Sequence, residues 1–309
     1  MRVIVSASRR TDIPAFYSRW FLQRLREGFC LYPNPFDPRR HHRVDLRPES
    51  VLGLVFWTRD ARPLLKHLDG LDREGYAYYF QYTINNYPPS LDPGSPALSR
   101  AAATFRELAE RLGPQRVVWR YDPVILGGEM DREWHLRNFA HILGELGDHA
   151  VRVTVSVIDP YRRARAGLRR ALGEVRYEPA AYRELLRRLA EEAASRGIGL
   201  NSCAEPHLLA EGVEAGRCVD AGMFNAGGDE KAAAPYPLHR QREGCLCHRS
   251  VDIGAYDTCP SGCVYCYAVK SPARARAAHA AHDPRWPCLT CPGPPTGETE
   301  SVFPRPGQD

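Results

Sequence analysis

Short apolar runs rich in β-branched and aromatic residues alternate with amphipathic stretches along most of the chain. The amphipathic stretches predict helices over Pro14–Gly28, Ala97–Leu112, Arg132–Leu146 and Pro179–Arg196. This alternation favours an α/β fold with a parallel sheet and right-handed crossovers. Eight predicted strands fit a (β/α) TIM-like barrel, closed or partly closed. These strands are Arg2–Ser8, Gly53–Thr58, Tyr76–Ile84, Arg116–Tyr121, Val151–Ile158, Gly199–Ser202, Ala221–Asn225 and Ser250–Tyr256.

Two segments fall outside this alternation. Residues 30–45 predict a hairpin-like excursion, in which Pro33, Pro35 and Pro38 interrupt regular structure. The chain after Pro287 is rich in Pro and Gly, a composition typical of disorder. We therefore expect one barrel domain over residues 1–283, followed by a disordered tail over residues 284–309.

Composition narrows the class of protein. The chain has 309 residues, of which 43% are hydrophobic, enough for a substantial core. The net charge of +5 rests almost entirely on Arg, and a chain also rich in Ala, Pro and Gly is typical of a GC-rich genome. The basic charge is thus weak support for a nucleic-acid partner. The Arg-rich runs Arg162–Arg170 and Arg183–Arg188 fall in helix-like stretches and are interpreted as solvated faces.

The sequence predicts the cellular compartment through two features that it lacks, an apolar leader and a membrane-spanning run. The chain begins Met-Arg-Val-Ile-Val-Ser without an apolar leader, and no run reaches the roughly 18 apolar residues that span a membrane. We therefore expect a cytoplasmic protein with no membrane partner. Ten Cys in such a protein are more typical of metal binding than of disulfides.

Cys259, Cys263 and Cys266 form a C-x3-C-x2-C triad that can present three thiolates from one loop to one iron–sulfur cluster. A [4Fe–4S] cluster has four irons, so three ligands leave one iron open. The alternatives are a zinc knuckle and a disulfide loop. Zinc sites favour two C-x2-C pairs, and the triad lacks the second pair at that spacing.

The triad spacing, with Tyr265 directly before the third Cys, resembles the radical S-adenosylmethionine (SAM) superfamily. The resemblance implies a [4Fe–4S] cluster whose open iron binds SAM, reductive cleavage to a 5′-deoxyadenosyl radical, and an electron donor such as ferredoxin or flavodoxin. In that superfamily the cluster loop follows the first strand, whereas here it follows the last predicted strand, Ser250–Tyr256. A circular permutation explains the change, because the first and last strands of a closed barrel are neighbours. We therefore expect Ser250–Tyr256 to pair in parallel beside Arg2–Ser8, with the iron–sulfur loop over residues 245–270.

A second set of cysteines is large enough to bind its own metal centre. Four thiolates would complete an auxiliary [4Fe–4S] cluster, and a tetrathiolate zinc site or no metal at all are the alternatives. Cys288 and Cys291 lie in the predicted tail and are interpreted as incidental, and Cys30 as an ordinary strand residue. The second set is Cys203, Cys218, Cys245 and Cys247.

Polar and aromatic residues gather at the carboxyl ends of the predicted strands, the face that carries chemistry in (β/α) barrels. Arginine pairs there can bind a carboxylate through a bidentate fork, or form internal salt bridges. A tyrosine there could donate a hydrogen atom or proton, or serve as a hydrogen-bonded wall. The catalytic candidates are Arg9, Arg10, Asp12, Arg120, Tyr121 and Asp122. The candidates for binding SAM are Tyr265, Trp57, Thr58, Thr83 and Glu205. The alternative roles of these residues are packing in the barrel and, for Glu205, capping of the next helix.

A set of segments spread along the chain carries a second resemblance, namely Ile4–Pro14, Asn34–Phe36, Phe56–Thr58, Trp119–Pro123, Ser202–Glu205 and Asp252–Tyr256 with the triad. On these segments the chain to about Asp283 resembles an uncharacterised prokaryotic family catalogued as domain-of-unknown-function family 1848, whose name implies no activity. Thr83, Leu91–Pro96 and Arg120–Ile125 carry a fainter likeness to the spore photoproduct lyase branch, which implies DNA-lesion repair as an alternative.

These observations predict a radical SAM-type enzyme acting on an unknown polar substrate, a small molecule or a nucleotide. The alternative class is a non-catalytic iron–sulfur or zinc protein with an electron-transfer or structural role. Consumption of SAM by the reduced protein separates the two classes.

Overall fold

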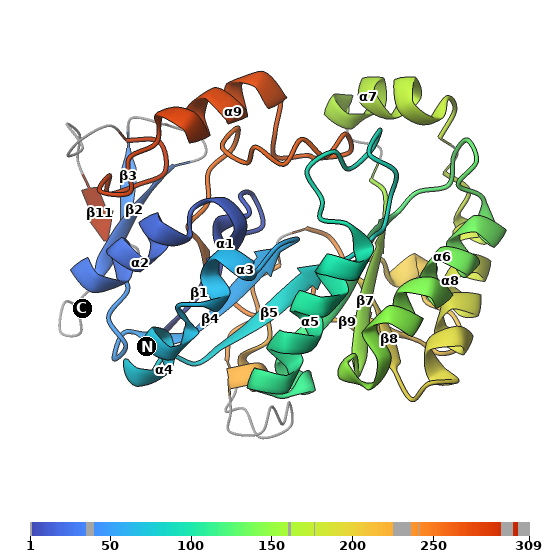
Figure 1. The fold of residues 1–309 in the computed structure, drawn as a ribbon, viewed down its shortest axis with the longest axis horizontal. Helices are drawn as coiled ribbons and strands as arrows, with labels where there is room; N and C mark the ends of the chain where they lie inside the picture. The colour runs from blue at the N-terminus through green and yellow to red at the C-terminus, as the bar shows by residue number, and fades with distance from the viewer. Residues whose placement is uncertain are drawn as a thin grey trace.

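A parallel sheet of eight strands forms the centre of the protein, in the order β10-β1-β4-β5-β6-β7-β8-β9 (Figure 1). The computed structural model describes residues 2–34, 40–159, 162–175, 177–224, 236–240, 242–291 and 299–301. The predicted α/β class with a large parallel sheet is therefore confirmed. The strands are β1 (Val3–Ala7), β4 (Val51–Thr58), β5 (Tyr78–Thr83), β6 (Val117–Val124), β7 (Arg152–Val157), β8 (Gly199–Cys203), β9 (Val213–Gly216) and β10 (Val251–Asp252).

The last strand of the sheet lies beside the first strand of the chain. β10 pairs in parallel with β1, with Val251 opposite Val5 and Asp252 opposite Ser6. The predicted pairing of the last strand is confirmed, although β10 is only two residues long. Within the residues described above, no ladder joins β9 to β10, so the sheet is open between these two edges.

Nine helices are found in the described part of the chain, and most of the long ones follow the predicted amphipathic stretches. The predicted helix over residues 14–28 is divided at Tyr17 into α1 and α2. α6 begins after Asp131, whose side chain accepts a hydrogen bond from the backbone N–H of Trp134 at 2.8 Å. The helices are α1 (Ile13–Phe16), α2 (Ser18–Glu27), α3 (Arg62–Leu65), α4 (Leu68–Arg73), α5 (Leu98–Leu112), α6 (Arg132–Leu146), α7 (Arg162–Leu172), α8 (Pro179–Ala194) and α9 (Pro272–Ala281).

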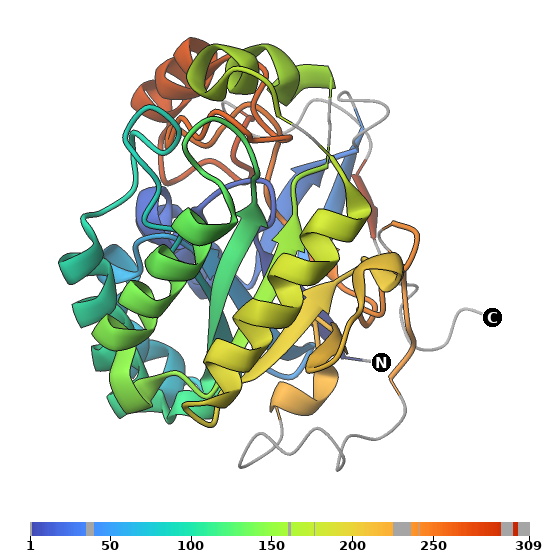
Figure 2. The same cartoon turned by 90° about the vertical axis from the view of Figure 1, so that its right-hand side faces the viewer.

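The two faces of the sheet bury different residues, because side chains alternate along each strand. One face packs against the helices, with Phe56 and Trp119 in the main core. The opposite face packs Val55 and Val118 against Cys218 and neighbouring residues of the segments that follow β9. Polar strand residues that neighbour main-core residues in the sequence therefore point to this opposite face, at the carboxyl ends of the strands. Figure 2 shows α7, α9 and the loop after β10 together at that end.

One predicted strand is wrong. Residues 221–224 form a 3-10 turn, and Asn225 lies outside the described residues. Asp220 causes this turn, because its carboxylate accepts from the N–H of Gly222 at 3.0 Å and its carbonyl from the N–H of Met223 at 3.3 Å. The edge strand is instead β9, whose sequence Val-Glu-Ala-Gly has no apolar run.

A small second sheet lies beside the main one. β2 (Phe29–Pro33) and β3 (His41–Asp45) form an antiparallel hairpin, which confirms the excursion predicted over residues 30–45. β11 (Thr299–Ser301) pairs in parallel with β3. Pro35 and Pro38 lie outside the described residues, as do residues 292–298 and 302–309 of the predicted tail.

Residues 285–291 dock onto the domain. The indole N–H of Trp20 in α2 donates to the carbonyl of Trp286 at 2.8 Å. The backbone N–H of Leu31 in β2 donates to the carbonyl of Pro287 at 2.8 Å. In the part of the chain that the structure describes, no helix combines the length and the apolar character needed to cross a membrane.

Candidate functional site

A cavity of about 490 Å³ lies at the carboxyl ends of the strands. It is lined by strand-end residues of the sheet and by the loop that follows β10. All seven cysteines of the two predicted ligand sets line it, so one cavity joins the triad to the second set. Its charged lining consists of five arginines and three aspartates, namely Arg9, Arg10, Arg59, Arg120, Arg242, Asp12, Asp122 and Asp159.

The loop after β10 carries the triad and is fixed to the first helix and to the loop after β5. The hydroxyl of Tyr17 donates to the carbonyl of Thr258 at 2.7 Å, and the N–H of Val264 donates to the carbonyl of Leu91 at 2.9 Å. Gly94 lies so close to this loop that a Cβ there would be 2.3 Å from the carbonyl oxygen of Ser261. The positions of the triad sulfurs are therefore set by contacts on both sides of the loop.

The three triad thiols are half-buried and are weak acids in this environment. Burial raises the pKa of Cys259 to about 12, and it also raises the pKa values of Cys263 and Cys266. The N–H of Ala268 donates to the sulfur of Cys266 at 3.3 Å. Without a metal these groups are neutral thiols at pH 7, so metal binding would displace their protons.

The spacing of the sulfurs distinguishes a single metal ion from a cluster. A tetrahedral zinc with Zn–S bonds of about 2.3 Å places its sulfurs about 3.8 Å apart. Among the described residues, one group alone brings three ligand atoms within 4.8 Å of one another, and it contains none of the seven cavity cysteines. In neither cavity set do three sulfurs gather as closely as the ligands of one zinc ion, although single pairs of the second set are in contact.

Tyr265 points into a buried network of polar residues beside the triad. Its hydroxyl donates to Asp92 at 2.6 Å and accepts from Arg59 at 2.6 Å and from Asn85 at 3.1 Å. Arg59 also pairs with Asp92 at 3.0 Å. Burial raises the pKa of Tyr265 well above its usual value, so its hydroxyl stays protonated and can hold this network.

Asp252 anchors the two predicted arginines at the end of β1. The Arg9 Nε atom lies 3.4 Å from its carboxylate, and the Arg10 Nη1 atom lies 3.7 Å away. The hydroxyls of Ser6 and Ser8 donate to it at 2.8 and 2.7 Å. Burial alone would raise the pKa of Asp252, but the two arginines and these hydrogen bonds lower it below its usual value. The carboxylate is charged, and it holds both guanidinium groups at the cavity.

Arg120 connects the strand ends to the second cysteine set. It donates to Asp122 at 2.5 Å and to the sulfur of Cys218 at 3.1 Å. Its guanidinium lies over the ring of Trp57, 5.0 Å from the centroid. A planar ligand that stacks on this face of Trp57 would therefore have to displace Arg120.

The second cysteine set is contiguous. The sulfurs of Cys203 and Cys218 share a hydrogen bond at 2.9 Å, and Cys247 has hydrogen bonds with both Cys218 and Cys245 that raise the pKa of Cys247. The hydrogen bonds with Cys203 and Cys247, together with the Arg120 guanidinium, hold the pKa of Cys218 well below its usual range. One thiolate, the form that binds metals, is thus stabilised before any metal arrives.

The remaining predicted residues divide into two groups. Trp57, Thr58, Thr83 and Asp12 line the cavity. Asp12 also caps α1 by accepting from the N–H of Ala15 at 3.1 Å, and burial raises the pKa of Asp12 to about 6.

Two candidates do not line the cavity. Tyr121 lies on the helix side of β6, where its hydroxyl is 2.7 Å from Nδ1 of His135. Glu205 follows the cavity residue Cys203 by two positions. Its carboxylate accepts from the N–H of Val157 at 2.7 Å and from the hydroxyl of Ser202 at 2.8 Å. Its side chain does not cap the following turn.

Several site residues were missed in the sequence, among them Arg59, Asp92, Asp252 and Arg242. Arg59 follows directly after β4, and its place at a strand end was the available signal. Asp92 and Asp252 stand within segments on which the expected family resemblances rested, but nothing in their local sequence indicates which cation each would pair with.

Fold and site together define an α/β protein with a parallel sheet and a cysteine-lined cavity at its carboxyl edge. The chain belongs to the family described as Domain of unknown function (DUF1848), whose family model matches residues 4–268. The match includes both cavity cysteine sets and ends before Cys288. No curated protein matches the chain.

Proposed function

We propose that the protein is a radical SAM-type iron–sulfur enzyme in which Cys259, Cys263 and Cys266 hold a [4Fe–4S] cluster with an open iron. The observation that carries the proposal is the placement of three cysteines from one loop at the carboxyl edge of a parallel sheet, beside a cavity lined by arginines. When bound, such a cluster supplies the electron that cleaves SAM into methionine and a 5′-deoxyadenosyl radical.

The surroundings of the triad support a cluster. The wide sulfur spacing suits a polynuclear group, and hydrogen bonds to ligand sulfurs, such as the one from Ala268 to Cys266, tune cluster potentials. We further propose that the sheet is a partly closed, circularly permuted barrel. The support is the position of β10 and its cysteine loop beside β1.

The arginines of the cavity are suited to an anionic group. Arg9 and Arg10 are held by Asp252 but remain partly exposed, with 18% and 24% of their side-chain surfaces accessible. A guanidinium offers paired donors to a carboxylate. We assign the carboxylate of SAM or an anionic substrate to these two arginines, with Arg120 and Asp122 as further polar lining of the same cavity.

Cys203, Cys218, Cys245 and Cys247 are proposed to hold an auxiliary [4Fe–4S] cluster. Their contiguity and the low pKa of Cys218 support a thiolate-bound metal. A reductive reaction needs a one-electron donor, for which we propose a ferredoxin or flavodoxin. Metal-binding thiols persist in a reducing compartment, which supports the cytoplasm.

The test is anaerobic purification followed by iron analysis and incubation of the reduced protein with SAM. Cys263→Ala should lose about four irons per chain and all 5′-deoxyadenosine formation. Cys30→Ala is the matched control, because Cys30 is buried in β2 and does not line the cavity. Equal iron in Cys263→Ala and wild type would contradict the cluster. An iron-replete protein that leaves SAM intact would favour the non-catalytic class.

A further inference from the structure

The C-terminal segment brings two cysteines to a histidine of the small sheet, away from the cavity. Cys288 and Cys291 are buried against Leu31 of β2. Their sulfurs and a ring nitrogen of His41 in β3 all lie within 4.8 Å of one another. We infer that His41, Cys288 and Cys291 form a three-ligand zinc site that fastens the C-terminal segment to the β2–β3 hairpin.

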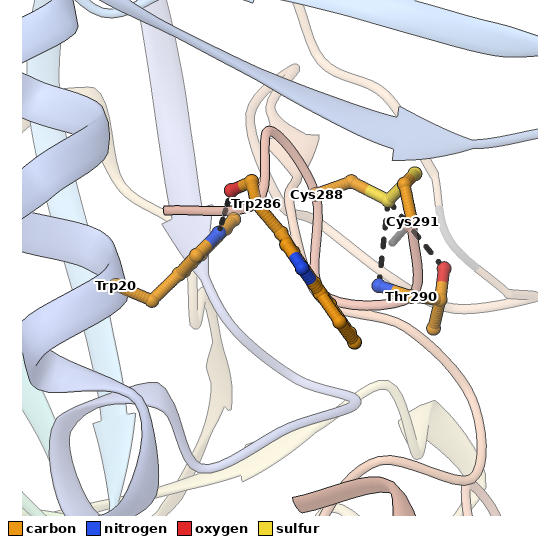
Figure 3. Close-up of a disulfide and its surroundings, with 5 residues drawn as sticks. All are labelled: Trp20, Trp286, Cys288, Thr290 and Cys291. Atoms are coloured by element: carbon orange, nitrogen blue, oxygen red, sulfur yellow. Dashed lines mark hydrogen bonds between the residues drawn. A yellow bond between two sulfur atoms is a disulfide. The ribbon is translucent and has the colours of Figure 1, made fainter. Parts of the chain in front are cut away.

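The backbone places these cysteines without help from a metal. The carbonyls of Trp286 and Pro287 accept from Trp20 and Leu31 at 2.8 Å each. Figure 3 shows the first of these bonds beside the cysteine turn. Because the segment is anchored immediately before Cys288, the two sulfurs are presented to the hairpin by the fold. A preorganised site of this kind binds a metal with little further ordering.

The donors suit zinc. The cysteines have the C-x2-C spacing of zinc sites, and thiolate with imidazole is a common zinc ligand combination. The N–H of Thr290 donates to the sulfur of Cys288 at 3.3 Å, which stabilises a thiolate (Figure 3). The Nδ1 atom of His41 is buried and has no hydrogen-bond partner among the described residues. Leaving such an atom unsatisfied is unfavourable, and a metal ion or its bound water would satisfy it.

Cys288 and Cys291 are joined by a disulfide in the structure, with their Cα atoms 5.3 Å apart (Figure 3). The zinc site belongs to the reduced state. A phosphine reductant supplies two electrons to the S–S bond. One water molecule supplies the two protons that the sulfurs take up and the oxygen that converts the phosphine into a phosphine oxide. Zn²⁺ then displaces both thiol protons, and water takes the fourth tetrahedral position. Disulfide and zinc therefore exclude each other at this pair.

The test uses the full-length protein purified with a phosphine reductant, and zinc per chain is measured by mass spectrometry of the elements. Cys288→Ser should lose one zinc per chain. His41→Ala should bind zinc at least about tenfold more weakly in competition with a chromophoric chelator, because even loss of an outer-shell partner costs about 10–100-fold. His42→Ala is the matched control, since His42 is the next residue of β3 and packs on Tyr32 with centroids 5.1 Å apart.

Equal zinc content and affinity in wild type, Cys288→Ser and His41→Ala would overturn the proposal. A second measurement needs no variant. X-ray absorption at the zinc edge of wild type should show two sulfurs at about 2.3 Å and a nitrogen at about 2.0–2.1 Å. A shell of four sulfurs would place the zinc on the cavity cysteines and would also refute the site.

Discussion

Replacement of Asp252 by Asn should destabilise the protein strongly, because this carboxylate joins the last strand of the sheet to the first. It accepts hydrogen bonds of 2.7–2.8 Å from the hydroxyls of Ser6 and Ser8 and from the N–H of Arg9, and only 7% of the residue is exposed. Removing one partner of a buried ion pair lowers the free energy of unfolding by about 3–5 kcal/mol. For a chain of this size, that loss lowers Tm by roughly 6–20 °C.

The assay is thermal and urea unfolding of the reduced protein. Asp69→Asn is the matched control, because the Asp69 side chain is 78% exposed and pairs with Arg111 at the surface. Exposed pairs contribute about 0–1 kcal/mol. If the two Asn variants lose the same free energy of unfolding, Asp252 does not hold β10 to β1.

The pH dependence checks that Asp252 is charged. Its pKa is lowered in the folded state, so its contribution to stability is complete above the usual pKa of about 4 and is lost as the pH falls through the folded value. The difference in unfolding free energy between wild type and Asp252→Asn should therefore be constant from about pH 8 to 5 and should shrink in more acidic solution. A difference that grows on acidification would contradict a charged carboxylate.

Three further predictions test other parts of the account. Burial lowers the pKa of His135 to about 4, so the unfolding free energy of wild type minus that of His135→Gln should fall by about 3 kcal/mol between pH 6.5 and 4 in urea titrations. Gly254→Ala places a Cβ 1.9 Å from Oγ of Ser8 and should lower the free energy of unfolding by about 1–3 kcal/mol in the same assay. Gly144→Ala in α6 is the control: its Cβ would have no neighbour within 4 Å, so the substitution should be neutral or stabilising. Cys247→Ser should remove about half of the bound iron in metal analysis, and an unchanged iron content would eliminate the auxiliary cluster.

Strong periodicity made most of the fold predictable. α6 has the predicted bounds, and β7 lies within its predicted run, because apolar residues recur at the helix and strand periods there. The pairing of β10 with β1 followed from the position of the cysteine loop. β9 could not be predicted, because an edge strand with exposed Glu214 has almost no apolar pattern.

The site was harder to predict than the fold, because its polar pairs join distant segments. Arg59 meets Asp92 only because the loops after β4 and β5 are neighbours, and pairing of this kind has no local signal. The position of Tyr121, in contrast, could have been foreseen. Arg120 and Asp122 flank it in β6 and line the cavity, so strand alternation directs Tyr121 to the helix side.

The central claim is that the triad cluster keeps an iron open to SAM, and electron paramagnetic resonance tests it most directly. The measurement uses reduced Cys247→Ser protein, in which the triad would hold the remaining cluster. The account predicts a [4Fe–4S]⁺ spectrum that changes when SAM is added and does not change with adenosine. A reduced-cluster spectrum that saturating SAM leaves unaltered would contradict the claim, because every iron would then already be fully ligated.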